Sequence, residues 1–159
     1  MVSLLKKSEL EFLGRFFLLF FIPYILLHVA DVSPLSSAIA GVESSALSAA
    51  GFPASSSGSL LFVGESVYEI VPDCTGLVMV ILLFALLYST PLDSNRRLRG
   101  LLVFTPLLLA FNLARLAVTL LTGAWFGPTA LEGAHVLLWF VDSAVVLLAW
   151  GRAAGVKLI

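Results

Sequence analysis

Four long apolar runs, separated by shorter polar segments, dominate the pattern of the chain. They cover residues 12–30, 75–89, 101–122 and 135–150. A helix that crosses the hydrocarbon core of a membrane needs about 20 residues, with a range of roughly 17–25. The first and third runs meet this length directly, and the other two meet it if their ends extend or the bilayer thins locally. The pattern predicts about four transmembrane helices, near residues 12–30, 73–90, 100–122 and 134–151.

The polar segment between the first two runs, residues 31–73, carries structure signals of its own. Apolar residues recur there at helical spacing, at Leu35, Ile39, Val42, Ala46 and Ala49. This spacing predicts a short amphipathic helix lying on the membrane surface; a serine-rich irregular loop is the alternative.

Phe52-Pro53 and the serines of residues 55–59 then break that helix. Two runs of β-prone residues follow, 60–63 and 66–71, joined by Gly64-Glu65. A two-residue turn between such runs favours a β-hairpin over an irregular loop. The expected architecture is therefore an all-α integral membrane protein with one short amphipathic helix and a possible hairpin.

Composition supports a membrane protein and one domain. The 159 residues are 60% hydrophobic and 12% charged, with a mean hydropathy of +1.06. Soluble domains are closer to half apolar and a quarter charged, so lipid must be the main solvent here. The length suits a single domain over residues 1–159. Nucleic-acid binding is not expected, because no basic stripe exists outside short loops.

Basic residues predict the orientation. Eight of the nine Lys and Arg residues fall on one side if the four runs span alternately: Lys6, Lys7, Arg15, Arg96, Arg97, Arg99, Arg152 and Lys157. The opposite side carries six acidic residues and no basic one. Because cytoplasmic loops are rich in Lys and Arg, both termini are expected in the cytoplasm, with the protein in the plasma membrane.

A secretory signal is a competing interpretation of the N-terminus. Ala38-Ile39-Ala40 resembles a cleavage site after a basic and apolar stretch. The apolar stretch ends near Ala30, however, which leaves a long gap before that site. Cleavage there would not alter the orientation of the other three helices.

Cys74 is the single cysteine, so no internal disulfide can form. It follows Pro72-Asp73 at the outer start of the second helix. With Asp73 as N-cap, Cys74 would occupy the first helical position, where the helix dipole favours the thiolate. The amides of Thr75 and Gly76 could then donate to an oxyanion. The alternative is a buried structural cysteine.

Arg115 lies inside the third apolar run. It precedes Thr122 by seven residues, or roughly 10 Å along a helix. A charge at that depth is costly and indicates function by default. Asn112 and Thr119 share its helical face. The alternative is a structural ion pair with Asp142, which lies at a similar depth in the fourth run.

His135 opens the fourth helix at the outer interface and is the natural general base near neutral pH. His28, at the outer end of the first helix, is the rival base.

One cysteine and two histidines without ligand spacing predict no metal site, and no cofactor is expected. The predicted topology brings Cys74, Arg115 and His135 to one level on three helices. Together they form a workable set for acyl transfer.

Three short motifs resemble those of the exosortase/archaeosortase family. They are Cys74-Thr75-Gly76-Leu77, Asn112-Leu113-Ala114-Arg115-Leu116 after Pro106, and Gly133-Ala134-His135. Order, spacing and topology agree with the family pattern over roughly residues 63–150. The chain departs from it in Thr75, where Ser is commoner, in Leu116, where Ile is commoner, and in its short length, which fits a compact, archaeosortase-like member.

The resemblance implies a membrane cysteine enzyme acting at the outer face. Such enzymes cut the C-terminal sorting signals of exported proteins and pass the new C-terminus to a membrane lipid or other acceptor. Cys74 would be the nucleophile, Arg115 the anion stabiliser and His135 the base. Two other functions stay open: a membrane protease that ends in hydrolysis, and a non-enzymatic membrane protein or assembly partner with a structural Arg115–Asp142 pair.

Overall fold

The computed structural model describes residues 7–155, so Lys6 and Lys157, used above for orientation, lie outside the described residues. The elements within that range are α1 (Lys7–Val29), α2 (Ser33–Ala49), β1 (Ala54–Ser57), β2 (Leu60–Val63), β3 (Ser66–Glu69), the 3₁₀ turn η1 (Pro72–Thr75), α3 (Leu77–Ser89), α4 (Ser94–Phe126) and α5 (Pro128–Ala154). The chain is thus mainly helical, as expected.

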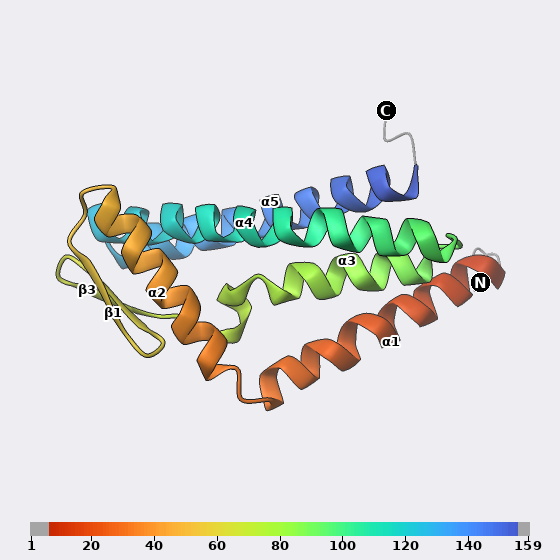
Figure 1. The fold of residues 1–159 in the computed structure, drawn as a ribbon, viewed down its shortest axis with the longest axis horizontal. Coiled ribbons are helices and arrows are strands. Elements are labelled where there is room, and N and C mark those ends of the chain that lie inside the picture. The colour runs from red at the N-terminus through yellow and green to blue at the C-terminus, as the bar shows by residue number, and fades with distance from the viewer. Residues whose placement is uncertain (1–6, 156–159) are drawn as a thin grey trace.

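Helices α1, α3, α4 and α5 run along the long axis of the molecule, with α2 and the sheet at one end (Figure 1). Helix α5 packs on α4 and α3, whereas α1 packs chiefly against α3. The beginnings of α1 and α4 lie with the ends of α3 and α5 at the opposite end (Figure 1). This end is called the basal end below, and α2 with strands β1–β3 is called the cap.

Within residues 7–155, three helices are long and apolar enough to cross a membrane: α1, α4 and α5. This confirms the expectation of an all-α membrane protein. The second predicted span differs, because α3 has only 13 residues and covers about 20 Å. Helix α4 is longer than predicted, with 33 residues, or about 50 Å. This length exceeds the roughly 30 Å of a bilayer core, and Leu116 and Leu120 of α4 join a buried cluster with residues of the cap.

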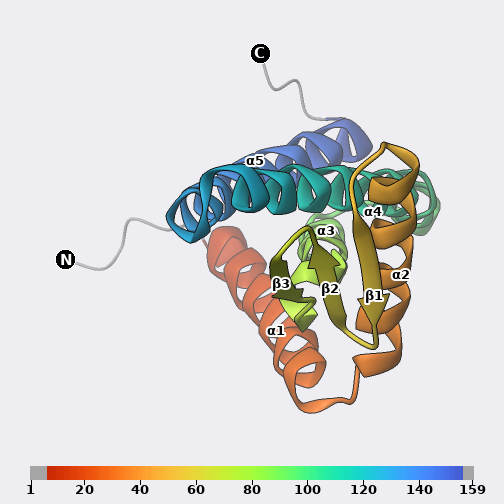
Figure 2. The same ribbon diagram turned by 90° about the vertical axis from the view of Figure 1, so that its left-hand side faces the viewer.

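The cap contains the predicted helix and the predicted hairpin. Strands β2 and β3 pair antiparallel around Gly64-Glu65, from Leu60 opposite Glu69 to Val63 opposite Ser66. The serine-rich stretch that the sequence assigned as a break instead forms β1, which pairs with β2. Figure 2 shows the three strands beside α2. Side-chain hydrogen bonds to α2 compensate β1 for its poor strand composition: Ser44 Oγ donates to Ser56 Oγ at 3.1 Å, and Ser48 Oγ to the Ala54 carbonyl at 2.8 Å.

The buried face of α2 is not the one that the apolar spacing indicated. Leu35 and Val42 are exposed, by 37% and 51%, whereas the buried side chains are Ser36, Ile39, Ala40, Glu43, Ser44 and Leu47. Small residues on this face let α2 approach the sheet closely. The cap core joins Ile39, Ala40, Leu47, Leu61, Val63 and Ile70 to Cys74, Leu116 and Leu120. Through this core the cap is packed directly against the segment that holds Cys74.

Glu43 is a buried carboxyl group within the cap. It is only 2% exposed, and its Oε2 atom has no hydrogen-bond partner among residues 7–155. Burial raises the pKa of Glu43 from 4.5 to about 7. Between these two values the folded chain binds more protons than the unfolded chain, so the free energy of unfolding falls as the pH rises from about 4.5 to about 7.

We expect Glu43→Gln to remove this loss of stability, raising the thermal unfolding midpoint at pH 8 but not at pH 4. The pKa difference limits the gain to about 3 kcal/mol. Thermal melts in detergent, followed by circular dichroism at both pH values, measure it. Glu65→Gln, at the exposed turn of the hairpin, is the matched control. A gain of equal size at both pH values would contradict the assignment of the effect to the charge of Glu43.

Candidate active site

Cys74 lies in the tight turn η1, not at the start of a helix. Pro72 opens this turn, Thr75 Oγ1 donates to the Pro72 carbonyl at 2.6 Å, and Gly76 then adopts a left-handed conformation with φ +78°. Helix α3 begins only at Leu77. The prediction that Asp73 caps the helix and that Cys74 is its first residue is therefore wrong. The reason is the proline turn followed by a glycine that reverses the backbone.

This position changes the state of the thiol. Cys74 is 7% exposed and belongs to the cap core. Burial raises the pKa of the Cys74 thiol, whereas its backbone hydrogen bond to Val71 and the charge of Arg115 act in the opposite direction. Helix α3, whose dipole was expected to favour the thiolate, begins three residues after Cys74. The raised pKa favours the neutral thiol over the thiolate.

Asn112 connects the first two sequence motifs. Its side chain is 1% exposed, and Nδ2 donates to the Cys74 carbonyl at 2.8 Å. Its Oδ1 atom accepts from Arg115 Nη1 at 3.4 Å. Asn112 and Cys74 are 38 positions apart in the sequence. Asn112 therefore holds the cysteine turn at a set position relative to the arginine.

Arg115 is the centre of the polar cluster. It is 4% exposed; its Nε atom lies 3.2 Å from Asp142 Oδ2, and its Nη2 atom 3.5 Å from His135 Nδ1. The ion pair considered from sequence is thus present. His135 can accept from Arg115 only when Nδ1 is unprotonated, which places the proton of the neutral ring on Nε2. One guanidinium contacts all three of Asn112, His135 and Asp142.

The two histidines occupy different surroundings. The prediction that His135 opens its helix is wrong, because α5 begins at Pro128, seven residues earlier. His28 Nε2 lies 3.3 Å from Asp73 Oδ1, and its Nδ1 atom lies 2.9 Å from the Tyr24 carbonyl. His28 therefore contacts the residue next to Cys74, whereas His135 contacts Arg115. Within residues 7–155, no hydrogen bond joins Cys74 Sγ to either ring. Catalytic hydrogen bonds often tighten only in the substrate complex, so this geometry excludes neither histidine as the base.

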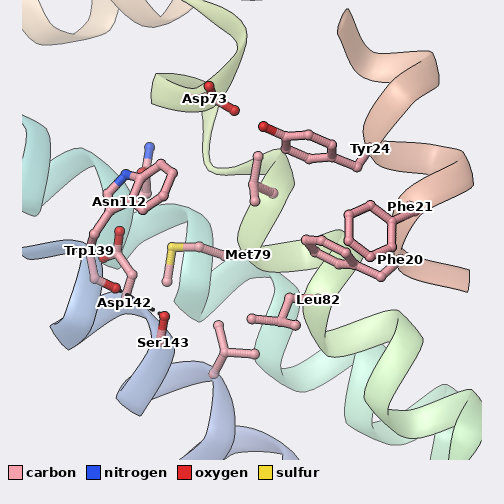
Figure 3. Close-up of a pocket in the computed structure, with 12 residues that line it drawn as sticks. Phe20, Phe21, Tyr24, Asp73, Met79, Leu82, Asn112, Trp139, Asp142 and Ser143 are labelled. Carbon is pink, nitrogen blue, oxygen red and sulfur yellow. Dashed lines mark hydrogen bonds between the residues drawn. The ribbon is translucent and has the colours of Figure 1, made fainter. Parts of the chain in front are cut away.

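A cavity of about 350 Å³ lies directly beside this cluster, between α1, α3 and α5. Its polar wall is formed by Asp73, Asn112 and Asp142 (Figure 3). The remaining wall is mainly apolar and comes from Phe20, Phe21, Tyr24, Val78, Met79, Leu82, Trp139, Ser143 and Val146. The sequence contained no signal for this wall, because its members are ordinary span residues whose meeting depends on helix packing. Within residues 7–155, no group of three or more metal-binding side chains occurs.

Gly76 is required both by the turn and by the cluster. A Cβ atom there would lie 3.0 Å from Asn112 Cγ and 3.1 Å from Asn112 Nδ2, in a backbone conformation that L-residues rarely adopt. We expect Gly76→Ala to displace Asn112 and to destabilise the fold by about 1–2 kcal/mol. Gly41→Ala, where no atom lies within 4 Å, is the control. Thermal melts measure both variants, and equal melts for the two would contradict the prediction.

Comparison with known proteins agrees with the motifs and the membrane helices. The profile of the transmembrane exosortase family matches residues 4–154. No curated protein and no solved structure matched the chain. The profile covers the cysteine turn, the Asn112–Arg115 segment and His135 in one continuous match. The chain is a multi-pass membrane protein that belongs to the transmembrane exosortase family, and this membership associates it with the processing of sorting signals at a membrane.

Proposed function

We propose that this protein is a cysteine-dependent transpeptidase or endopeptidase that removes C-terminal sorting signals from exported proteins. The observation that carries the proposal is the polar network itself. Asn112 binds both the backbone of Cys74 and the guanidinium of Arg115, and Arg115 also contacts His135. A structural ion pair needs only Arg115 and Asp142, so the two further partners are explained better by a reaction site.

In the proposed reaction, His135 Nδ1 releases its hydrogen bond from Arg115 and takes the proton of the Cys74 thiol, and Sγ attacks the scissile carbonyl carbon. The carbonyl oxygen becomes an oxyanion that Arg115 stabilises by donating hydrogen bonds. The C–N bond then breaks, and His135 returns the proton to the leaving amine. A thioester between Cys74 and the new C-terminus remains. An acceptor amine or hydroxyl, or water, attacks this thioester, loses its proton and restores the thiol.

Supporting residues have separate roles. Asn112 positions the cysteine turn, and Asp142 keeps the guanidinium in place through the 3.2 Å contact. Thr75 closes the turn through its hydrogen bond to Pro72. The backbone freedom of Gly76 allows the turn to meet α3. The amides of Thr75 and Gly76 remain candidate donors to the oxyanion.

The proposed substrate is a tail with a short motif, an apolar helix and a basic end. Its apolar helix would lie along the membrane helices, so that the scissile bond reaches the level of Cys74. Both termini of the enzyme would be cytoplasmic and the site would face outward, as the basic residues favour. The proposed acceptor is a membrane lipid or another exposed nucleophile, and residues 1–159 would act as one domain.

A second function is favoured by two observations. The Arg115–Asp142 pair and the burial of Cys74 also fit a non-enzymatic membrane protein, for example an assembly partner. In that case the thiol is a packing group and no exported protein changes in its C-terminus.

Mass spectrometry of C-termini in host membranes, with and without the protein, tests the proposal. We expect a set of exported proteins to lose an apolar tail only when the protein is present. The mass of the new C-terminus separates transfer from hydrolysis, because a transferred product carries the acceptor and a hydrolysed one ends in a free carboxylate. An identical set of C-termini in both cells would overturn the enzymatic proposal and favour the assembly partner.

A further inference from the structure

A second site lies at the basal end, far along the bundle from Cys74. Arg96 and Arg99, near the start of α4, and Arg152, near the end of α5, line a cavity of about 330 Å³. Gly100 forms part of its floor, where a Cβ atom would lie 3.0 Å from Ala153 Cβ. Helices α4 and α5 approach each other closely at Gly100. The side chains of Arg96, Arg99 and Arg152 surround the cavity and are called the basic rim below.

The positive charge of this rim is largely uncompensated. Arg96 pairs with Asp93 at 3.4 Å, but both side chains are more than 60% exposed, so solvent screens the pair. Arg99 and Arg152 have no carboxylate partner within residues 7–155. Arg97 does not contribute, because its Nη2 atom donates to the Thr90 carbonyl and its guanidinium lies 5.1 Å from the Tyr88 ring centre.

An apolar cavity continues from this rim between α4 and α5. It has a volume of about 270 Å³ and shares Phe104 and Arg152 with the basic cavity. Its other lining residues are all apolar: Leu107, Leu108, Val145, Leu148 and Ala149. Helices α4 and α5 are long and apolar enough to span a membrane, so a cavity lined by their apolar side chains suits a lipid chain. A ligand that fills both cavities needs an anionic head and a hydrocarbon chain.

We propose that the basic rim and the adjoining apolar cavity bind an anionic phospholipid. The phosphate accepts hydrogen bonds from the planar guanidinium groups of Arg99 and Arg152, each of which can donate to two phosphate oxygens, and one acyl chain lies against Phe104, Leu107 and Leu148. Basic pockets between transmembrane helices are a recognised setting for such head groups. A free phosphate would use the rim but leave the apolar cavity unfilled. The site is independent of the proposed chemistry and of which side of the membrane the basal end faces.

Native mass spectrometry of the full chain in detergent, titrated with phosphatidylglycerol or phosphatidylcholine, tests this assignment. We expect one phosphatidylglycerol to be retained and phosphatidylcholine to be lost at the same activation energy. Arg99→Gln/Arg152→Gln should weaken this retention about thirtyfold, since each basic group near a membrane contributes roughly a fivefold factor. Leu107→Trp, which fills the apolar cavity from an exposed position, should weaken it without changing the charge.

Lys7→Gln/Arg15→Gln is the matched control, because it removes two positive charges from exposed positions on α1 that line neither cavity. Retention close to that of the wild type in this variant supports the site. Equal losses in the two double variants would overturn it in favour of general surface attraction. Displacement of the lipid by millimolar inorganic phosphate, together with full retention in Leu107→Trp, would overturn it in favour of a free-phosphate site. Each variant must elute as a monodisperse peak and keep the circular dichroism spectrum of the wild type, which shows that it is folded.

Discussion

Cys74→Ala is expected to reduce the processing of sorting tails by a factor on the order of 10³ or more, while the protein inserts normally. The thiol is the only one in the chain. The adjacent Thr75 hydroxyl donates to the Pro72 carbonyl and does not replace it. The substitution removes one atom from a buried side chain, so the cap core should lose little stability. C-terminal mass spectrometry of exported proteins at equal expression measures processing, and membrane fractionation measures insertion.

Thr75→Ser is the matched control for this turn. A serine hydroxyl can still donate to the Pro72 carbonyl, as Thr75 does at 2.6 Å, and leaves the thiol untouched. We expect it to retain processing within a few fold of the wild type. Processing that persists in Cys74→Ala would remove the cysteine mechanism, and the thiol would then be a packing group of the cap.

The second large effect is expected at Arg115. Arg115→Lys keeps the positive charge but loses the planar group that contacts Asn112, His135 and Asp142 at once. We expect processing to fall by about 10²–10³, the range for removal of one oxyanion donor. Steady-state assays with a tail-bearing reporter measure the loss. Arg97→Lys, at the basal end, is the control and should retain activity.

Asp142→Asn, compared with Arg115→Lys, tests whether Arg115 acts in catalysis or only in the structural ion pair. Breaking a buried ion pair leaves Arg115 uncompensated and should lower the free energy of unfolding by up to about 3–5 kcal/mol. If Arg115 is only structural, Arg115→Lys should preserve processing while Asp142→Asn still melts early. If Arg115 acts on the oxyanion, Arg115→Lys should lose processing even where its melting temperature stays near that of the wild type.

Local chemistry made much of the fold predictable. Apolar runs of membrane length predicted the long helices, because backbone groups in lipid must bond within their own segment. Gly64-Glu65 between two β-prone runs predicted the β2–β3 hairpin, because such a turn sets strand register locally. The single cysteine, an arginine within the third apolar run and a histidine at the start of the fourth run also stand out in the sequence. These features depend on residues close together in the chain.

Tertiary structure decided what the local pattern left open. Strand β1 forms from serines only because α2 supplies hydrogen bonds to Ser56 and to the Ala54 carbonyl. The α2 face that carries Glu43 is buried because small residues there allow close packing, which outweighs the apolar spacing. Cys74 leaves the helix start because Pro72 and Gly76 build a separate turn. Sequence alone therefore determined which chemical groups exist and in which apolar runs they lie, while the contacts among Asn112, Arg115, His135 and Asp142 depend on how α4 and α5 pack.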